Sequence, residues 1–200
     1  MYARVVTFTG VNDIDGAVRF MQETVLPVLR AQQGYQGASA SGDRSSGVFG
    51  ALSLWESAAD RDASESALGK LREEAGRQLG AGGATMETFE ERVREVSRPP
   101  AVGSRLMLTR ISMDPAKIDE NLSFFTAQVV PQIKASPGFR ALRNMINPQT
   151  GEGLVGTVWD DEATMQAAAE AAMARRGEGV ARGVNFGDTS YREILFNDAP

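Results

Sequence analysis

The chain has 200 residues, of which 42% are hydrophobic and 24% charged, and its formal net charge is −5. This length is sufficient for two small domains or one fused double domain with a substantial core. The acidic balance, without a Lys/Arg cluster, argues against nucleic acid and anionic membrane surfaces, because both are bound through clustered positive charge.

The chain contains no histidine and no cysteine. It therefore has no imidazole base, no Ser-His-Asp triad, no disulfide, no thiolate and no histidine-ligated metal or haem. Carboxylates alone could hold Mg²⁺ or Ca²⁺, but no Asp-rich loop has EF-hand spacing. We expect neither a cofactor nor a metal. The strand-like start at residues 1–8, without a cleavable signal or long apolar span, favours a soluble cytoplasmic protein.

In chain order, the first strand is expected over residues 4–9, where Val, Thr and Phe are frequent. A helix follows from Asn12-Asp13, with apolar residues at helical spacing, and Pro27 predicts a kink or break within it. Gly34 ends this helix. A strand, a turn at 42–47 and a second strand ending at Trp55 come next.

A second helix begins after Ser57 and runs to about residue 79, and the last strand covers 86–96. The same order then returns. Trp159 lies 159 minus 55, or 104, residues after Trp55, and this offset also places Pro131 on Pro27 without a gap. The chain is therefore interpreted as a duplicated unit of about a hundred residues.

The second copy is expected to have strands at 106–112, from 140 and at 190–196, with a turn at 147–153. Its first helix begins at Asp114-Pro115, and its second is capped by Asp160 or Asp161 and ends near residue 174. Residues 177–179 are interpreted as a flexible connection, and Arg175-Arg176 as solvated helix surface.

Each unit is thus β-α-β-β-α-β, the order of a ferredoxin-like fold, and the class is α+β. The expected domains are residues 1–97 and 104–200, joined by a linker at 98–103 that contains two prolines and a glycine. Two such sheets can bury their open faces against each other. The expected architecture is an intramolecular pseudo-dimeric α+β barrel in a monomer, with further homodimerisation left open.

The helical prolines, the Gly34-Tyr35 and Gly138-Phe139 pairs and the tryptophans that end a strand before a helix resemble one known group of proteins. This group is the dimeric α+β barrel superfamily, and within it the antibiotic-biosynthesis-monooxygenase-like proteins. The resemblance covers nearly the whole chain twice. It implies the fold more specifically than the activity, because members include cofactor-free oxygenases, haem-degrading enzymes, isomerases and proteins without known activity.

The haem-degrading pattern combines an Asn on the first strand, a Trp ending the third and an iron-binding His on the next helix. Trp55 and Trp159 match the Trp, but the Asn position falls near Thr7 in the first copy and near Thr109 or Arg110 in the second, and no His is present. This argues against haem degradation.

A cofactor-free oxygenase needs only a pocket that binds an aromatic substrate, favours its anion and excludes water. The resemblance therefore favours a protein that binds a small apolar or aromatic molecule, with cofactor-independent oxygenation of polyphenols as its enzymatic interpretation. The residues that could stack on such a ligand or hydrogen-bond to it are Trp159, Arg110, Asn144, Arg143, Trp55, Phe124 and Phe125, with Arg140 and Phe20 as further candidates.

Several of these residues also have a purely structural interpretation. Either tryptophan could be a core aromatic, and Arg110 could point to solvent. The alternative function is accordingly a non-catalytic binding or assembly module with a filled core. An isomerase or lyase would need a general base supplied by a carboxylate, Tyr or Lys, and no paired carboxylates suggest one.

Overall fold

The computed structural model of the chain describes residues 1–199. Within the described residues, the strand pairs whose register the structure defines are antiparallel. The eight strands close into a barrel in the hydrogen-bonded order β1 (Tyr2–Thr9), β3 (Val48–Trp55), β2 (Tyr35–Asp43), β8 (Asn185–Asn197), β5 (Arg105–Ser112), β7 (Glu152–Trp159), β6 (Phe139–Ile146) and β4 (Gly83–Val96). The protein is therefore an α+β barrel protein.

The chain forms two compact units, residues 1–88 with 193–200 (unit 1) and residues 89–192 (unit 2). These bounds differ from the repeat bounds expected from the sequence, because the end of one strand in each repeat pairs outside that repeat. Residues 90–96 of β4 pair with β6, and residues 193–197 of β8 pair with β2.

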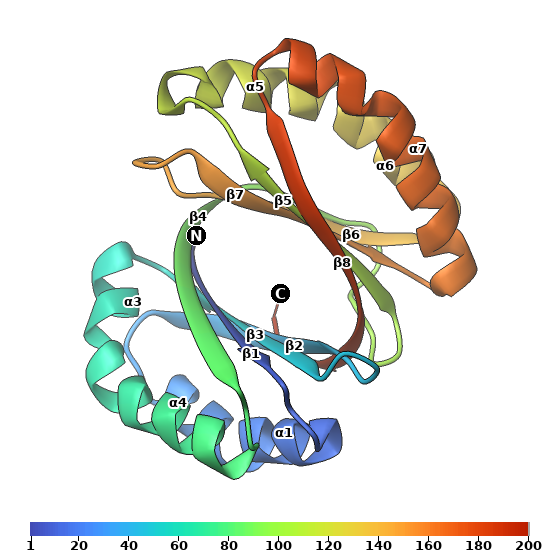
Figure 1. The fold of residues 1–200 in the computed structure, drawn as a ribbon. Coiled ribbons are helices and arrows are strands. Elements are labelled where there is room, and N and C mark those ends of the chain that lie inside the picture. Colours follow the sequence, from blue (N-terminus) through green and yellow to red (C-terminus); the bar gives the residue numbers. More distant parts are fainter. Residues whose placement is uncertain (200) are drawn as a thin grey trace. The chain divides into compact units, whose positions relative to one another are not determined.

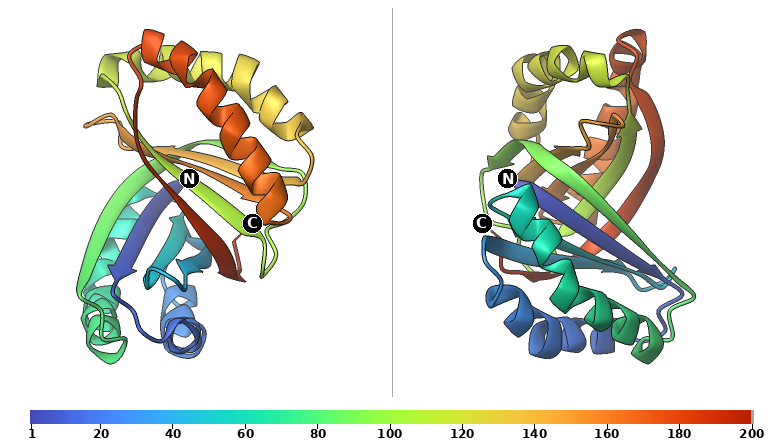
Figure 2. Two further views of the ribbon diagram at one scale, coloured as in Figure 1. Left: turned by 45° about the vertical axis from the view of Figure 1, so that its right-hand side comes forward. Right: turned by 90° about the vertical axis from the view of Figure 1, so that its left-hand side faces the viewer.

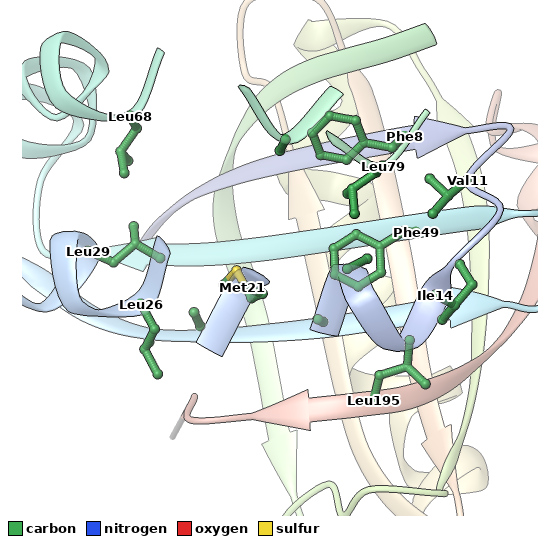
Figure 3. Packing of buried hydrophobic residues seen from close by; sticks show 14 of the residues in the cluster. Phe8, Val11, Ile14, Met21, Leu26, Leu29, Phe49, Leu68, Leu79 and Leu195 are labelled. Carbon is green, nitrogen blue, oxygen red and sulfur yellow. The ribbon is translucent and has the colours of Figure 1, made fainter. Parts of the chain in front are cut away.

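Unit 1 contains strands β1 (Tyr2–Thr9), β2 (Tyr35–Asp43) and β3 (Val48–Trp55), with the first part of β4 (Gly83–Val96) and the last of β8 (Asn185–Asn197). Its helices are α1 (Ile14–Phe20), a π-helical turn (Met21–Val25), α2 (Leu26–Arg30), α3 (Ala58–Ala63) and α4 (Glu65–Gln78). A cluster of buried hydrophobic residues fills most of the space between sheet and helices, and Figure 3 shows Phe8, Phe49, Met21 and Leu68 among its side chains.

Unit 2 contains β5 (Arg105–Ser112), β6 (Phe139–Ile146) and β7 (Glu152–Trp159), with the remaining parts of β4 and β8. Its helical segments are a 3₁₀ turn (Pro115–Lys117), α5 (Ile118–Phe124), a π-helical turn (Phe125–Val129), α6 (Val130–Ala135) and α7 (Glu162–Ala181). In each unit the helices cover one face of the strands (Figure 1 and Figure 2).

The helix starts follow from capping side chains. Asp13 accepts a hydrogen bond from the Gly16 N–H, and Ser57 accepts one from the Asp60 N–H. Asp161, rather than Asp160, caps α7 through a reciprocal pair of bonds with Thr164. Each cap satisfies an amide that has no partner within its helix.

The helical prolines each follow a π-helical turn, which confirms the predicted break. The Leu26 N–H bonds to the Met21 carbonyl, and the Val130 N–H bonds to the Phe125 carbonyl, both five residues back. Proline has no N–H and clashes with the carbonyl four residues before it, so a wider turn removes the conflict.

Helix α7 is longer than the sequence predicts, because it continues through Gly177 and Gly179 to Ala181. A Cβ at Gly179 would lie 2.8 Å from the ring of Phe186. The glycine therefore allows this ring on β8 to pack directly on the helix, and the packing offsets the weak helix propensity of glycine.

Candidate functional site

A cavity of about 390 Å³ lies within unit 2, between the helix-covered face of the sheet and helices α5, α6 and α7. Its floor is formed by one row of side chains across three strands. Thr109 on β5 is opposite Val155 on β7, which is opposite Asn144 on β6. All three residues line the cavity. Residues that are directly opposite each other on neighbouring strands project their side chains from the same face of the sheet.

The corresponding cavity of unit 1 measures about 80 Å³. At the 104-residue offset, Leu68 and Leu71 of α4 correspond to Ala172 and Arg175 of α7, and all four residues line the cavity of their own unit. The leucines fill the space above the sheet in unit 1. Ala172 is smaller than Leu68, and this loss of volume on the inward side of α7 contributes to the larger cavity in unit 2.

The side chain of Asn144 is the most distinctive polar group of the cavity. It is 3% exposed, and its Oδ1 has no hydrogen-bond partner among the residues that the structure describes. A buried acceptor without a partner costs about 1–3 kcal/mol. Such an atom in a cavity wall is suited to accept a hydrogen bond from a bound molecule.

A hydroxyl lies on the neighbouring strand. Thr157 on β7 is 2% exposed, and its Oγ1 accepts a hydrogen bond of 2.9 Å from the Trp159 Nε1. The indole N–H occupies one lone pair of this oxygen, so the hydroxyl hydrogen can donate to an acceptor in the cavity.

A third polar group belongs to a chain of hydrogen bonds that begins on α7. The Arg176 Nη2 donates to the Thr189 Oγ1 at 2.9 Å, and the Thr189 Oγ1 lies 3.1 Å from the Thr109 Oγ1. The guanidinium also lies 5.3 Å from the centre of the Phe186 ring. Arg176 is thereby held against the cavity by a hydrogen bond and a cation–π contact.

Three of the residues expected from the sequence to contact a ligand line this cavity, namely Asn144, Phe124 and Phe125. The Arg182 guanidinium lies 3.9 Å from the centre of the Phe124 ring. Phe20, the counterpart of Phe124 in the first repeat, lines the smaller cavity of unit 1.

The two tryptophans do not line either cavity. Trp159 is 1% exposed and packs edge-on against Phe139, with 5.7 Å between ring centres. Trp55 makes the same contact with Tyr35 at 5.9 Å and donates to the Ser53 Oγ. Both rings belong to a core cluster, as the structural interpretation of the tryptophans expected, and the Trp159 Nε1 donates to Thr157, which lines the cavity.

The arginine candidates lie elsewhere. Arg110 is exposed and follows Thr109 on β5, so its side chain projects from the face of the sheet opposite the cavity. Arg143 precedes Asn144 on β6, so its side chain projects from the face opposite the cavity. There it forms an ion pair with Glu91, and burial lowers the pKa of Arg143. Arg140 binds Asp160 and the Pro99 carbonyl.

The Arg98 and Arg140 guanidinium groups hold the pKa of Asp160 below its usual value.

No group of three or more acidic side chains in residues 1–199 is arranged to hold a metal ion. Over the same residues, no helix is long and apolar enough to cross a membrane.

The sequence interpretation missed Thr109, Thr157, Arg175 and Arg176 as cavity residues. Arg175 and Arg176 were assigned to solvated helix surface, whereas both are half-buried and line the cavity. One sequence signal could have found Arg175, whose counterpart is Leu71. When the second helices of the repeats are aligned at the 104-residue offset, an arginine falls on an apolar core position.

No family model matches the chain. The uncharacterized protein Rv2557 of Mycobacterium tuberculosis is 25% identical over 167 residues, which represent 83% of this chain and 74% of that protein. This level of identity makes the two proteins similar without assigning a function to either.

Solved structures match almost the full length. A proposed monooxygenase from Fusobacterium nucleatum has a TM-score of 0.70 at 9% identity, with 99% of this chain and 94% of that chain covered. An anthrone oxidase-like protein has a TM-score of 0.66 at 15% identity, with 100% and 92% covered. A haem-degrading enzyme from Listeria monocytogenes has a TM-score of 0.54 at 11% identity, with 96% and 99% covered.

At these identities the likeness concerns the fold alone. Further structures of the same kind include a ferredoxin-fold protein related to antibiotic-biosynthesis monooxygenases. The chain therefore has the α+β barrel fold that monooxygenase-like proteins share, as the resemblance in its sequence predicts.

Proposed function

We propose that this protein binds a small apolar or aromatic molecule in the cavity of unit 2. The observation that carries the proposal is the combination of a cavity of about 390 Å³ with the unpartnered Asn144 Oδ1 in its wall. Pockets for small ligands typically measure about 300–1,000 Å³ and combine apolar walls with a few polar groups. This cavity has both properties.

The alternative function, a binding or assembly module with a filled core, describes unit 1 better than unit 2. Leucine side chains reduce the cavity of unit 1 to about 80 Å³, whereas the cavity above the sheet of unit 2 measures about 390 Å³. The repeated offset of the tryptophan, proline and π-turn positions supports a tandem duplication. In this proposal only the second copy has kept a ligand site.

A cavity-filling substitution tests the binding proposal. Ala172 is half-buried on α7 and lines the cavity, so Ala172→Phe places an aromatic ring in the ligand's space. The ligand is represented by N-phenyl-1-naphthylamine, an uncharged aromatic probe with one N–H donor, whose fluorescence rises in apolar sites. Ala174→Phe is the matched control, since residue 174 is exposed on the same helix.

Probe binding by the wild type and by Ala174→Phe, with loss of at least about tenfold in affinity in Ala172→Phe, supports the proposal. Equal affinity in all three proteins, or no binding to the folded wild type, contradicts it.

A second candidate function is cofactor-independent oxygenation of a polyphenol. The Thr157 hydroxyl, the Asn144 amide and Thr109 supply hydrogen-bonding groups on one floor of an apolar cavity, where they could stabilise a phenolate. The phenolate would transfer electrons to O₂. For an anthrone, one oxygen atom enters the ring carbon as a carbonyl and the other leaves as water.

Oxygen uptake by metal-free protein with anthrone tests this activity. Removal of one such stabilising group costs about 10²–10³-fold in rate, so Asn144→Leu should reduce protein-dependent uptake strongly. Uptake that is absent in the wild type would leave the binding proposal but remove the oxygenase. Haem degradation is not proposed, because the chain has no histidine to bind the iron.

A further inference from the structure

We infer that the ligand of the unit 2 cavity carries an anionic group, a carboxylate or sulfonate, that binds Arg175 and Arg176. The inference rests on the proposed function, since it specifies the chemistry of the same ligand. Both arginines belong to α7, line the cavity and are half-buried.

The position of Arg175 is the first argument. Its counterpart at the 104-residue offset is Leu71, which packs against the core of unit 1 and lines the small cavity there. An apolar residue at this point of the helix stabilises the unit by burial. Unit 2 has a guanidinium at this position. Apolar packing of the helix on the sheet does not explain a charged group there.

The absence of protein counter-charges is the second argument. Among residues 1–199, no carboxylate forms an ion pair with Arg175 or Arg176. Arg176 binds only the neutral Thr189 hydroxyl and the Phe186 ring. A partly desolvated guanidinium without an anionic partner is left with unused hydrogen-bond donors. The geometry of these donors matches a planar carboxylate or a similar oxyanion.

The carboxylates of the cavity wall do not remove this positive charge. Glu178 and Asp188 also line the cavity, but both are exposed and neither forms an ion pair with an arginine of the wall. The half-buried charges of the cavity are therefore positive. Because desolvation strengthens a charge interaction, these arginines would dominate the selection of a ligand.

The third argument is the arrangement of polar groups. The arginines lie on α7, on the helical side of the cavity, while Asn144 lies on β6 in its floor. The Asn144 Oδ1 accepts a hydrogen bond and the guanidinium groups attract an anion. Together they favour an aromatic acid with a hydroxyl or N–H donor over a fully apolar ligand.

Two probes with the same aromatic body separate this inference from the proposed function. 8-Anilino-1-naphthalenesulfonate is N-phenyl-1-naphthylamine with an added sulfonate. The affinities of both probes are measured for the wild type, for the double variant Arg175→Gln/Arg176→Gln and for Arg77→Gln. Arg77 is exposed in unit 1 and provides a control for lost positive charge.

We expect the double variant to lose about tenfold or more in sulfonate affinity, the order of a charge-assisted hydrogen bond, and to bind the uncharged probe nearly as before. Arg77→Gln should bind both probes like the wild type. Added salt should weaken the sulfonate complexes of the wild type and of Arg77→Gln, and should affect the sulfonate complex of the double variant less.

Unchanged sulfonate affinity in the double variant, or an equal loss for both probes, would overturn the inference while the uncharged probe still demonstrates a binding cavity. If the folded wild type binds neither probe, both the inference and the proposed function fail. Near-ultraviolet circular dichroism of each variant shows whether its tertiary packing is intact.

Discussion

At the scale of single residues, the polar groups of the unit 2 cavity differ in their contribution to stability. The Asn144 Oδ1 is buried without a partner, whereas the Thr157 Oγ1 accepts the Trp159 Nε1 hydrogen bond. The residue corresponding to Asn144 in the first repeat is Ala40, a buried core residue. Asparagine at this position is therefore not needed to form the sheet.

Asn144→Leu should raise the free energy of unfolding by about 1 kcal/mol, because it removes an unsatisfied buried acceptor and keeps a similar volume. The same variant should bind N-phenyl-1-naphthylamine more weakly. Denaturant unfolding and probe titration measure the two effects.

Thr157→Val is the matched comparison, also polar to apolar in the same cavity wall. It should lower the free energy of unfolding by about 1–3 kcal/mol, because the Trp159 N–H loses its acceptor. If Asn144→Leu is destabilised as strongly as Thr157→Val, Asn144 has a structural role and is not reserved for a ligand.

The sequence predicts some of these residues and misses others for a physical reason. Asn144 and Phe125 could be selected from their residue type and strand or helix period alone. Residue type and helical period alone do not select Arg175, because an arginine in a polar helix looks like solvated surface; only the alignment of the two repeats, which places it on Leu71, does so. The two tryptophans were candidates by residue type. The sequence pattern is the same for a tryptophan that lines a cavity and for one that is packed in the core next to it.

At the scale of elements, the two hairpin turns have the same role but different chemistry. In the first, the Asp43 carboxylate accepts hydrogen bonds from the Ser45 N–H and from the Ser45 and Ser46 hydroxyls. These bonds lower the pKa of Asp43 from 3.8 to about 2. In the second turn the neutral Asn147 amide accepts from two backbone N–H groups.

The first turn should therefore be sensitive to acid. The pKa of Asp43 is lower in the folded than in the unfolded chain, so its contribution to stability is present above about pH 4 and is lost as the pH falls toward 2. Asp43→Asn, which copies the second turn, should be less stable than the wild type at pH 5. The difference, no more than about 1 kcal/mol for a solvated loop, should shrink toward pH 2.

Unfolding by urea at a series of pH values measures this difference. A difference between Asp43→Asn and the wild type that is independent of pH would show that the carboxylate is not specifically stabilised in the turn.

A close backbone approach fixes the second turn. Gly151 has φ of 75°, and a Cβ there would overlap the Met113 carbonyl oxygen. Gly103 also has a positive φ, 90°, but nothing lies within 4 Å of its Cβ position. Gly151→Ala should cost about 3 kcal/mol or more, and Gly103→Ala only the backbone strain of about 1 kcal/mol. Equal thermal midpoints for the two variants would contradict this.

At the scale of the whole molecule, the repeat bounds and the compact units differ. The sequence predicts the order of elements in both repeats and the β-α-β-β-α-β pattern from turn residues and periodicity. It does not predict that residues 90–96 pair with β6 or that residues 193–197 pair with β2. These pairings depend on strand edges that local patterns do not describe.

Two fragments distinguish the repeat from the unit. The fragment 89–192 contains all of unit 2, whereas 104–200 lacks the part of β4 that pairs with β6. We expect 89–192 to have a thermal midpoint at least about 5 °C above that of 104–200, since it retains the pairing along β6. Circular dichroism melts provide the comparison. A more stable 104–200 fragment would show that the sequence repeat is the folding unit.

The measurement that tests the central claim most directly is the methyl NMR spectrum of the full chain with saturating N-phenyl-1-naphthylamine. The claim is that unit 2 holds a ligand cavity and unit 1 a filled core. We expect shifts at Ile133, Ile146 and Val155, which line the cavity of unit 2, and no shifts at Leu68 and Leu71 in unit 1. Shifts confined to unit 1, or none at any cavity methyl group, would contradict the claim.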